Sequence, residues 1–253
     1  MLGALHFPSI ENLVEWPAWL FEGKFFELNK IGYMSLLAML IPTVLFLLAK
    51  KDLVPKGVQN VVESAVEFVE KQVILPAIGP DGMPYLPLLL SIFLFVFFGN
   101  LFEVIPTFNM PANARMANPM VLALIVWVMF VAVGIKHQGV GGYLKSSLFP
   151  PGVPKALYIL VTPIEFLSTF VLRPFGLAVR LFANMLAGHI LLVTFGVLCI
   201  ALWQKSALAA VLPFSFAMLV ALTGFEIMVA FLQAFVFSLL AAVYISSSLH
   251  PHH

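Results

Sequence analysis

Five long apolar runs constrain what this chain can fold into. They cover about residues 31–49, 86–105, 120–135, 155–203 and 207–248. A helix needs about 20 mostly apolar residues to cross the hydrocarbon core of a bilayer. Because 62% of the residues are hydrophobic and only 10% are charged, a water-soluble globular protein is excluded, since soluble domains carry about 25% charged residues. We predict an all-α, polytopic membrane protein with about five membrane-embedded helices, forming a single membrane domain over residues 1–253.

The regions outside the apolar runs have two recognisable patterns. Residues 1–30 mix acidic residues with Trp16 and Trp19, which suits a segment near the lipid headgroups. Over residues 58–74, apolar side chains recur at helical spacing with charged side chains opposite them. This pattern predicts an amphipathic helix that lies at the membrane interface or against a partner and does not cross the membrane.

The last two apolar runs are unusually long. Each exceeds 40 residues, which is about twice what a perpendicular span needs. They are therefore strongly tilted, bent or only partly embedded. We divide the chain into a first span at 31–49, an amphipathic helix on the cytoplasmic side at 58–74, a helical hairpin at 86–135 and a long tilted hairpin at 155–248.

Basic residues predict the orientation of the chain. If all five runs cross the membrane, one side receives Lys50, Lys51, Lys56, Lys136, Lys145 and Lys155. The positive-inside rule makes that side cytoplasmic. We therefore expect a multi-pass protein of a bacterial plasma membrane, with its N-terminus outside and its C-terminus in the cytoplasm.

Charge and cysteine content exclude further classes of function. A net charge of +1 offers no basic footprint for a nucleic acid. One cysteine, Cys199, rules out a disulfide framework and a cysteine-rich metal cluster. The sequence predicts no metal site and no cofactor.

Ionisable side chains inside the apolar runs carry most of the functional information. A charge in the hydrocarbon region costs about 3 kcal/mol on insertion scales, so such a residue points to function by default. The ionisable residues are Glu103, Glu165, Arg173, Arg180, His189 and Glu226, and three amide side chains accompany them, Asn100, Asn184 and Gln233.

Arg180 gives the strongest of these signals. No acidic residue lies within one helical turn of it, and an arginine does not lose its proton at any working pH. Asn184 and two alanines share its helical face, which forms a strip of low relief that another helix can approach closely. The partner of Arg180 then lies on another protein or in a water-filled cavity, or Arg180 forms a structural ion pair with Glu165 or Glu226.

His189 and Glu226 combine two titratable chemistries at membrane depth. Burial can bring both groups to titrate near neutral pH, so they suit a proton relay or a buried hydrogen bond that only joins two helices. His189 follows Arg180 by nine residues, which places the two side chains on roughly opposite faces of a helix. Gln233 follows Glu226 by seven residues, so these two share a face, about 10 Å apart along the axis.

Two more carboxylates lie near the ends of their runs. Glu103, with Asn100, precedes a proline, and it either lines an outer entrance or only marks the helix end. Glu165 lies near the inner end of the fourth run. It either lines an inner aqueous entrance or pairs with Arg173 or Lys155.

Three motifs resemble one family, subunit a of the rotary (F-type) ATP synthases. Residues 173–189 (RPFGLAVRLFANMLAGH) resemble its signature helix, and residues 224–237 (GFEIMVAFLQAFVF) resemble its last helix. Residues 99–106 (GNLFEVIP) resemble the N-L-x-[DE]-x-x-P ending of an earlier helix. With the matching layout of the apolar runs, the resemblance covers most of residues 85–248.

The resemblance implies a proton path that is shared with a rotating ring of c subunits. It implies that Arg180 is the stator arginine facing the ring, with Asn184 and Gln233 as its polar neighbours. The outer half-channel is then lined by His189, Glu226, Glu103 and Asn100, and the inner one by Glu165. Some relatives carry the glutamate and the histidine of the His189–Glu226 pair in the reverse order.

The resemblance also implies the partners and the packing of the chain. Its partners are the c-ring, peripheral-stalk b-type subunits, the whole ATP synthase complex and lipid. The last two helices pack as a near-horizontal hairpin around the ring, and proton flow drives ATP synthesis. The chain has no catalytic site of its own in this scheme.

Two other classes of function remain open at the level of the sequence. A secondary transporter with a buried arginine–carboxylate site predicts repeat symmetry and broken helices, which the sequence does not show. A structural membrane scaffold predicts that Arg180→Ala leaves any activity intact.

Overall fold

The computed structural model describes residues 30–49, 56–105, 112–113, 115–149, 154, 157–203 and 210–249. Every regular element in these ranges is a helix, which confirms the all-α prediction. Five stretches are long and apolar enough to cross a membrane, at Ile31–Leu48, Pro80–Leu101, Ala117–Leu148, Tyr158–Leu202 and Leu212–Leu249. The expected N-terminal surface segment and the C-terminal histidines lie outside the described residues.

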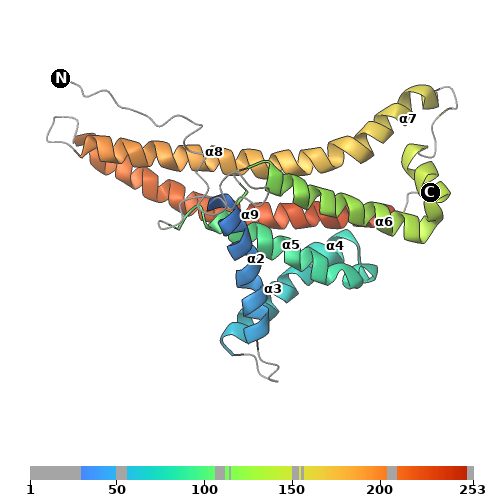
Figure 1. Ribbon diagram of the computed structural model, residues 1–253, viewed down its shortest axis with the longest axis horizontal. Helices are drawn as coiled ribbons and strands as arrows, with labels where there is room; N and C mark the ends of the chain where they lie inside the picture. Colours follow the sequence, from blue (N-terminus) through green and yellow to red (C-terminus); the bar gives the residue numbers. More distant parts are fainter. Residues whose placement is uncertain are drawn as a thin grey trace, which may run out of the picture.

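The first described helices form a leg that projects from the main body (Figure 1). It consists of α2 (Lys30–Leu48) and α3 (Val58–Val69). α3 continues through a π-helical turn, η1 (Glu70–Ile74), into α4 (Leu75–Ala77). Val69, Val73 and Ile74 are buried, whereas Glu67 and Lys71 form an exposed ion pair, so this region is the amphipathic helix that the sequence predicts.

The middle of the chain forms two helices of the main body. A short 3-10 helix, η2 (Pro80–Tyr85), leads into α5 (Leu86–Leu101), and α6 spans Ala117–Leu148. α6 is longer than the apolar run 120–135, since helical structure also covers the more polar residues up to Leu148. It turns a corner at Gly139, which has φ 73° and ψ 163°, a conformation that glycine adopts without a steric cost.

Side-chain contacts fix the corner of α6. The ring of Tyr143 packs directly on Gly134, where a Cβ atom would lie 2.3 Å from the ring. The side chain of Gln138 donates a hydrogen bond of 2.8 Å to the carbonyl oxygen of Ser248, near the end of the last helix. The glycine-rich stretch around Gly139 is therefore a packed corner within α6.

The last part of the chain forms a long hairpin. α7 (Tyr158–Leu167), a π-helical turn η4 (Ser168–Leu172) and α8 (Arg173–Leu202) make one curved rod. α9 (Leu212–Leu249) lies beside α8 along the longest axis of the molecule, whereas α2 runs across that axis (Figure 1). The curve is located at η4 and Pro174, since π-helical turns and prolines both change the direction of a helix.

The core lies where α5, α6, α8 and α9 meet. Its largest fully buried side chains include Phe130, Leu181, Met185 and Phe237. Small buried residues of α9, such as Ala234 and Ala241, let neighbouring helices approach closely.

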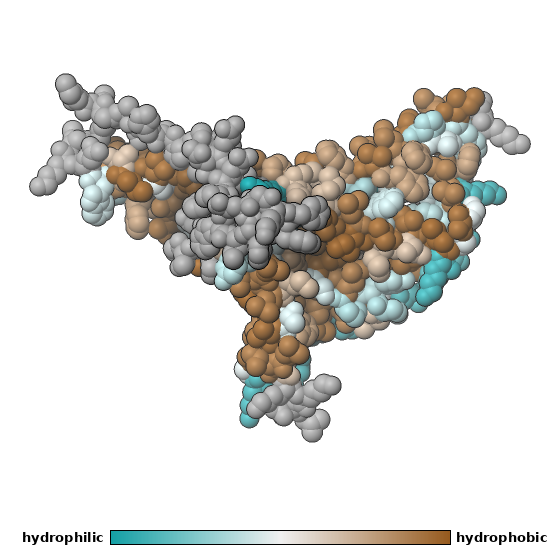
Figure 2. Space-filling view, viewed as in Figure 1, coloured by the Kyte–Doolittle hydropathy of each residue, from teal (hydrophilic) through white to brown (hydrophobic). Residues whose placement is uncertain are grey.

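The outside of the molecule is mostly apolar. Figure 2 shows hydrophobic residues over most of the visible surface, with hydrophilic residues gathered at its right-hand end and at the free end of the leg. Ile159, Ile200 and Trp203 are each more than three-quarters exposed. An apolar surface of this extent fits contact with lipid or with apolar faces of other proteins.

Candidate functional site

Three titratable side chains from separate elements meet in the interior. Glu103 follows α5, His189 belongs to α8 and Glu226 belongs to α9, and they are 2%, 6% and 4% exposed. The Nδ1 atom of His189 lies 3.8 Å from the Oε1 atom of Glu103. The carboxyl group of Glu226 lies against Gly188, where a Cβ atom would be 2.6 Å from its Oε2 atom. The absence of a side chain at Gly188 therefore makes room for Glu226 between α8 and α9.

Two asparagines lie beside this cluster. The side-chain amide of Asn113 donates a hydrogen bond of 2.7 Å to the Oδ1 atom of Asn100, and these residues are 0% and 1% exposed. Gly99 permits the contact, because a Cβ atom there would lie 3.2 Å from the Nδ2 atom of Asn113. Asn100 is a predicted site residue, whereas Asn113 is not, because it lies outside the apolar runs in which a polar residue stands out.

Several buried polar atoms of these residues have no hydrogen-bond partner within the described part of the chain. They are Asn100 Nδ2, Glu103 Oε1, Asn113 Oδ1 and Glu226 Oε2. An unsatisfied buried polar group costs about 1–3 kcal/mol, so native proteins hold few of them without a reason. Their concentration here makes this region polar, in contrast to the apolar core.

Arg180 lies on the other side of α8. It is exposed, as are Ala183 and Ala187, whereas Leu181 and His189 are buried. The separation of nine positions between Arg180 and His189 thus places them on different faces of α8, as the sequence predicts.

Arg180 forms no ion pair with any acidic side chain among the described residues. The structural pair with Glu165 or Glu226, left open by the sequence, is not formed. Glu226 points instead towards Gly188, and Glu165 is a half-buried residue of α7.

The remaining predicted residues lie at other positions along the hairpin. Gln233 is 7% exposed on α9, two turns beyond Glu226, and Asn184 is half-buried on α8 one turn beyond Arg180.

Arg173 contacts the last helix and not Glu165. Its guanidinium lies 5.5 Å from the ring centroid of Tyr244, and its Nη1 atom donates a hydrogen bond of 3.4 Å to the hydroxyl of Ser247. These contacts join the start of α8 to the end of α9.

The cluster does not resemble a metal site. Over the ranges that the structure describes, no group of three or more His, Cys, Asp or Glu side chains is arranged to hold a metal ion. What the site offers is two carboxylates and an imidazole, which can take up and release protons, together with a permanent positive charge on the neighbouring surface.

Comparison with known proteins identifies the family. The family described as ATP synthase A chain matches residues 32–246. An ATP synthase subunit a of Rhodococcus erythropolis is 42% identical over 250 residues, which cover 97% of this chain and 90% of that protein. One of Frankia alni is 43% identical over 89% of this chain and 79% of its own length, and one of Streptomyces lividans is 36% identical over 97% and 88%. The resemblance found in the three motifs is therefore confirmed, and the chain belongs to the ATP synthase A chain family.

Proposed function

We propose that this chain acts as subunit a, the membrane stator of an F-type ATP synthase, and that Arg180 faces the c-ring. The observation that carries this proposal is the exposed position of Arg180, away from the acidic residues of its own chain. A guanidinium remains charged at every working pH, so on an apolar surface it needs an anionic partner. A carboxylate on each c subunit supplies that partner.

The fixed charge of Arg180 explains how a carboxylate on the ring gains and loses its proton. A carboxylate facing lipid must be neutral, whereas one beside Arg180 is stabilised in its ionised form. A proton is therefore released as a ring carboxylate reaches Arg180 and taken up as it leaves. The exposed alanines beside Arg180 support this role, because they allow a ring helix to approach closely.

The buried cluster is the proposed outer half-channel. Asn100, Glu103, His189 and Glu226 lie in the interior between α5, α8 and α9, and their carboxyl and imidazole groups suit stepwise proton transfer. Asn184 and Gln233 are the proposed polar neighbours of Arg180. Protons enter through this region and reach a ring carboxylate that has just left Arg180.

The inner half-channel is the proposed place of Glu165. Glu165 is a half-buried residue of α7, whereas the Glu103–His189–Glu226 cluster is formed by α8, α9 and the end of α5. Protons leave on this side after nearly a full turn of the ring. Arg180 lies between the two routes and, since it neither donates nor accepts protons readily, it prevents a direct leak. The membrane potential supplies about 2.3 kcal/mol per charge per 100 mV for this movement.

The arrangement of the helices supports a tilted hairpin around the ring. α8 and α9 follow the longest axis of the molecule while α2 crosses it (Figure 1). If α2 crosses the membrane steeply, α8 and α9 run at a low angle to the membrane plane. Their length, 30 and 38 residues, then gives a long contact with the ring.

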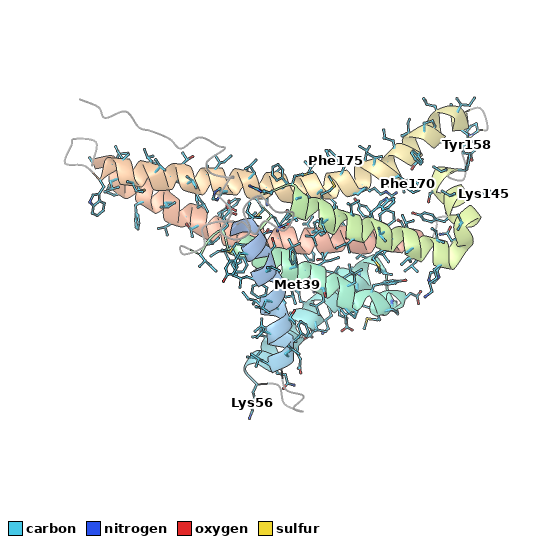
Figure 3. All side chains as sticks on the ribbon, viewed as in Figure 1. Met39, Lys56, Lys145, Tyr158, Phe170 and Phe175 are labelled. Atoms are coloured by element: carbon cyan, nitrogen blue, oxygen red, sulfur yellow. The ribbon has the colours of Figure 1, made fainter. Side chains whose placement is uncertain are left out.

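The proposed location is a bacterial plasma membrane, with the N-terminus outside and the C-terminus in the cytoplasm. Lys56 at the free end of the leg and Lys145 at the corner of α6 then lie on the cytoplasmic side (Figure 3). The proposed partners, besides the c-ring, are b-type subunits of the peripheral stalk.

The decisive experiment replaces Arg180 in the assembled complex. We expect Arg180→Ala to abolish ATP-driven proton pumping into proteoliposomes, while the detached catalytic sector still hydrolyses ATP. Lys145→Ala is the matched control, because Lys145 is an exposed residue near the C-terminal end of α6 at an extremity of the molecule (Figure 3); it retains pumping. Pumping that survives Arg180→Ala would contradict the stator role and favour a scaffold or a transporter site.

A further inference from the structure

Asn113 lies where the outer part of the polar cluster meets the segment before α6. Resting on the proposed function, we infer that Asn113 and Asn100 together hold water at the outer entrance of the proton route. In this role Asn113 is a positioning residue, because it acts by presenting water to Asn100 and Glu103 and does not itself carry the proton.

Each of the two side-chain amides has one polar atom that takes no part in the hydrogen bond between them. Asn113 donates to Asn100, but the Oδ1 atom of Asn113 and the Nδ2 atom of Asn100 have no hydrogen-bond partner among the described residues. One of these atoms is an acceptor and the other is a donor. Because both residues are almost fully buried, the pair can bind water through one free donor and one free acceptor.

The pair is continuous with the titratable cluster. Asn100 and Glu103 are three residues apart, and the backbone N–H of Glu103 donates a hydrogen bond of 3.1 Å to the carbonyl oxygen of Asn100. Glu103 in turn lies 3.8 Å from His189. Water held by the two amides is therefore one step from the first carboxyl group of the route.

Other contacts hold the segment that carries Asn113. The backbone N–H of Ala112 donates to the carbonyl oxygen of Gly99 at 3.0 Å. The side-chain amide of Asn118 donates to the carbonyl oxygen of Ala112 at 2.7 Å and to the hydroxyl of Ser35 at 2.5 Å. Since these bonds do not involve the Asn113 side chain, its removal leaves the segment attached to α2, α5 and α6.

These contacts provide a matched pair of variants. Asn113→Leu keeps most of the side-chain volume and removes both polar groups of the proposed water site. Asn118→Leu removes an anchoring amide from the same segment and leaves the Asn113–Asn100 pair in place. Asn113→Ser restores a hydroxyl that can bind water.

The experiment measures ATP synthesis by the assembled complex in proteoliposomes whose lumen corresponds to the outer side. The luminal pH is set to mildly acidic or mildly alkaline values, and a potassium diffusion potential keeps the total driving force constant. A water-binding residue matters most when protons are scarce. We therefore expect Asn113→Leu to slow synthesis about tenfold at alkaline pH, the factor that corresponds to one lost hydrogen bond, and much less at acidic pH.

The two controls separate a role in proton entrance from a structural role. We expect Asn113→Ser to recover the alkaline rate and Asn118→Leu to show no dependence on luminal pH beyond that of the unmodified complex. Equal slowing by Asn113→Leu at both pH values, or the same pH-dependent loss in Asn118→Leu, would overturn the inference. So would an unchanged alkaline rate in Asn113→Leu.

If the complex with Asn113→Leu does not assemble, the smaller variant Asn113→Val replaces it, and the same outcomes support or overturn the inference.

Failure of this inference is distinguishable from failure of the proposed function. Arg180→Ala abolishes pumping at every pH if the stator role holds, whatever the profile of the Asn113 variants.

Discussion

Gly188 determines how Glu226 fits between the two long helices. The carboxyl carbon and both oxygens of Glu226 lie within 2.7 Å of the position that a Cβ atom at Gly188 would take. The contact therefore depends on the absence of a side chain, and any larger residue must displace Glu226, α8 or α9.

We expect Gly188→Ala to reduce proton pumping by the assembled complex, because Glu226 must leave its place in the cluster. Overpacking of this kind costs about 1–3 kcal/mol. Gly196→Ala on the same helix is the control, since nothing lies within 4 Å of a Cβ atom there. Pumping rates of the two variants in proteoliposomes test the expectation; equal rates would show that Glu226 moves at no functional cost.

The sequence predicts most of the candidate site but not how its parts meet. Glu103, His189 and Glu226 stand out because charges are costly inside apolar runs. Their common location depends on how α5, α8 and α9 are aligned along one another, and no single run contains that information. Asn113 shows the same limit, since a polar loop residue becomes a buried one only through the packing of distant helices.

At the scale of single elements, α6 differs most from what its apolar run predicts. The apolar run indicates a helix that ends near Ile135, yet helical structure continues to Leu148 around the corner at Gly139. Periodicity does not reveal this, because the contacts that hold the corner, between Gly134 and Tyr143 and between Gln138 and Ser248, join residues from different turns and helices. The π-helical turns η1 and η4 are equally invisible in the apolar pattern.

The corner of α6 is sensitive to side-chain size at Gly134. A Cβ atom there would lie 2.3 Å from the Tyr143 ring, so Gly134→Ala forces the ring away and disturbs the contact with α9. We expect a destabilisation of about 1–3 kcal/mol, seen as a lower thermal midpoint of the complex. Gly141→Ala serves for comparison, because nothing lies within 4 Å of a Cβ atom there. A thermal midpoint of Gly141→Ala as low as that of Gly134→Ala would contradict the importance of the Gly134–Tyr143 contact.

At the scale of the whole molecule, apolar length and composition already indicate five spans and a long final hairpin. The leg formed by α2 and α3 and its direction across the hairpin are not visible in the sequence, because they follow from packing of α2 and α3 against α5. The lysines in the loops connect the sequence with the arrangement of the helices, because the positive-inside rule predicts which helix ends lie on the same side of the membrane. Lys50, Lys51 and Lys155 lie outside the described residues, which leaves Lys56, Lys136 and Lys145 for the structural test.

We expect Lys56 and Lys145 to lie on the same, cytoplasmic side, although they sit at separate extremities of the molecule (Figure 3). Each is replaced by cysteine in a chain that carries Cys199→Ser and is treated with a membrane-impermeant thiol reagent. Both sites react in inverted vesicles, whereas Trp203→Cys, at the exposed opposite end of α8, reacts only in right-side-out vesicles. If Lys56→Cys and Lys145→Cys were labelled from opposite sides, one of the apolar stretches between them would not cross the membrane. That result would contradict the proposed orientation of the chain.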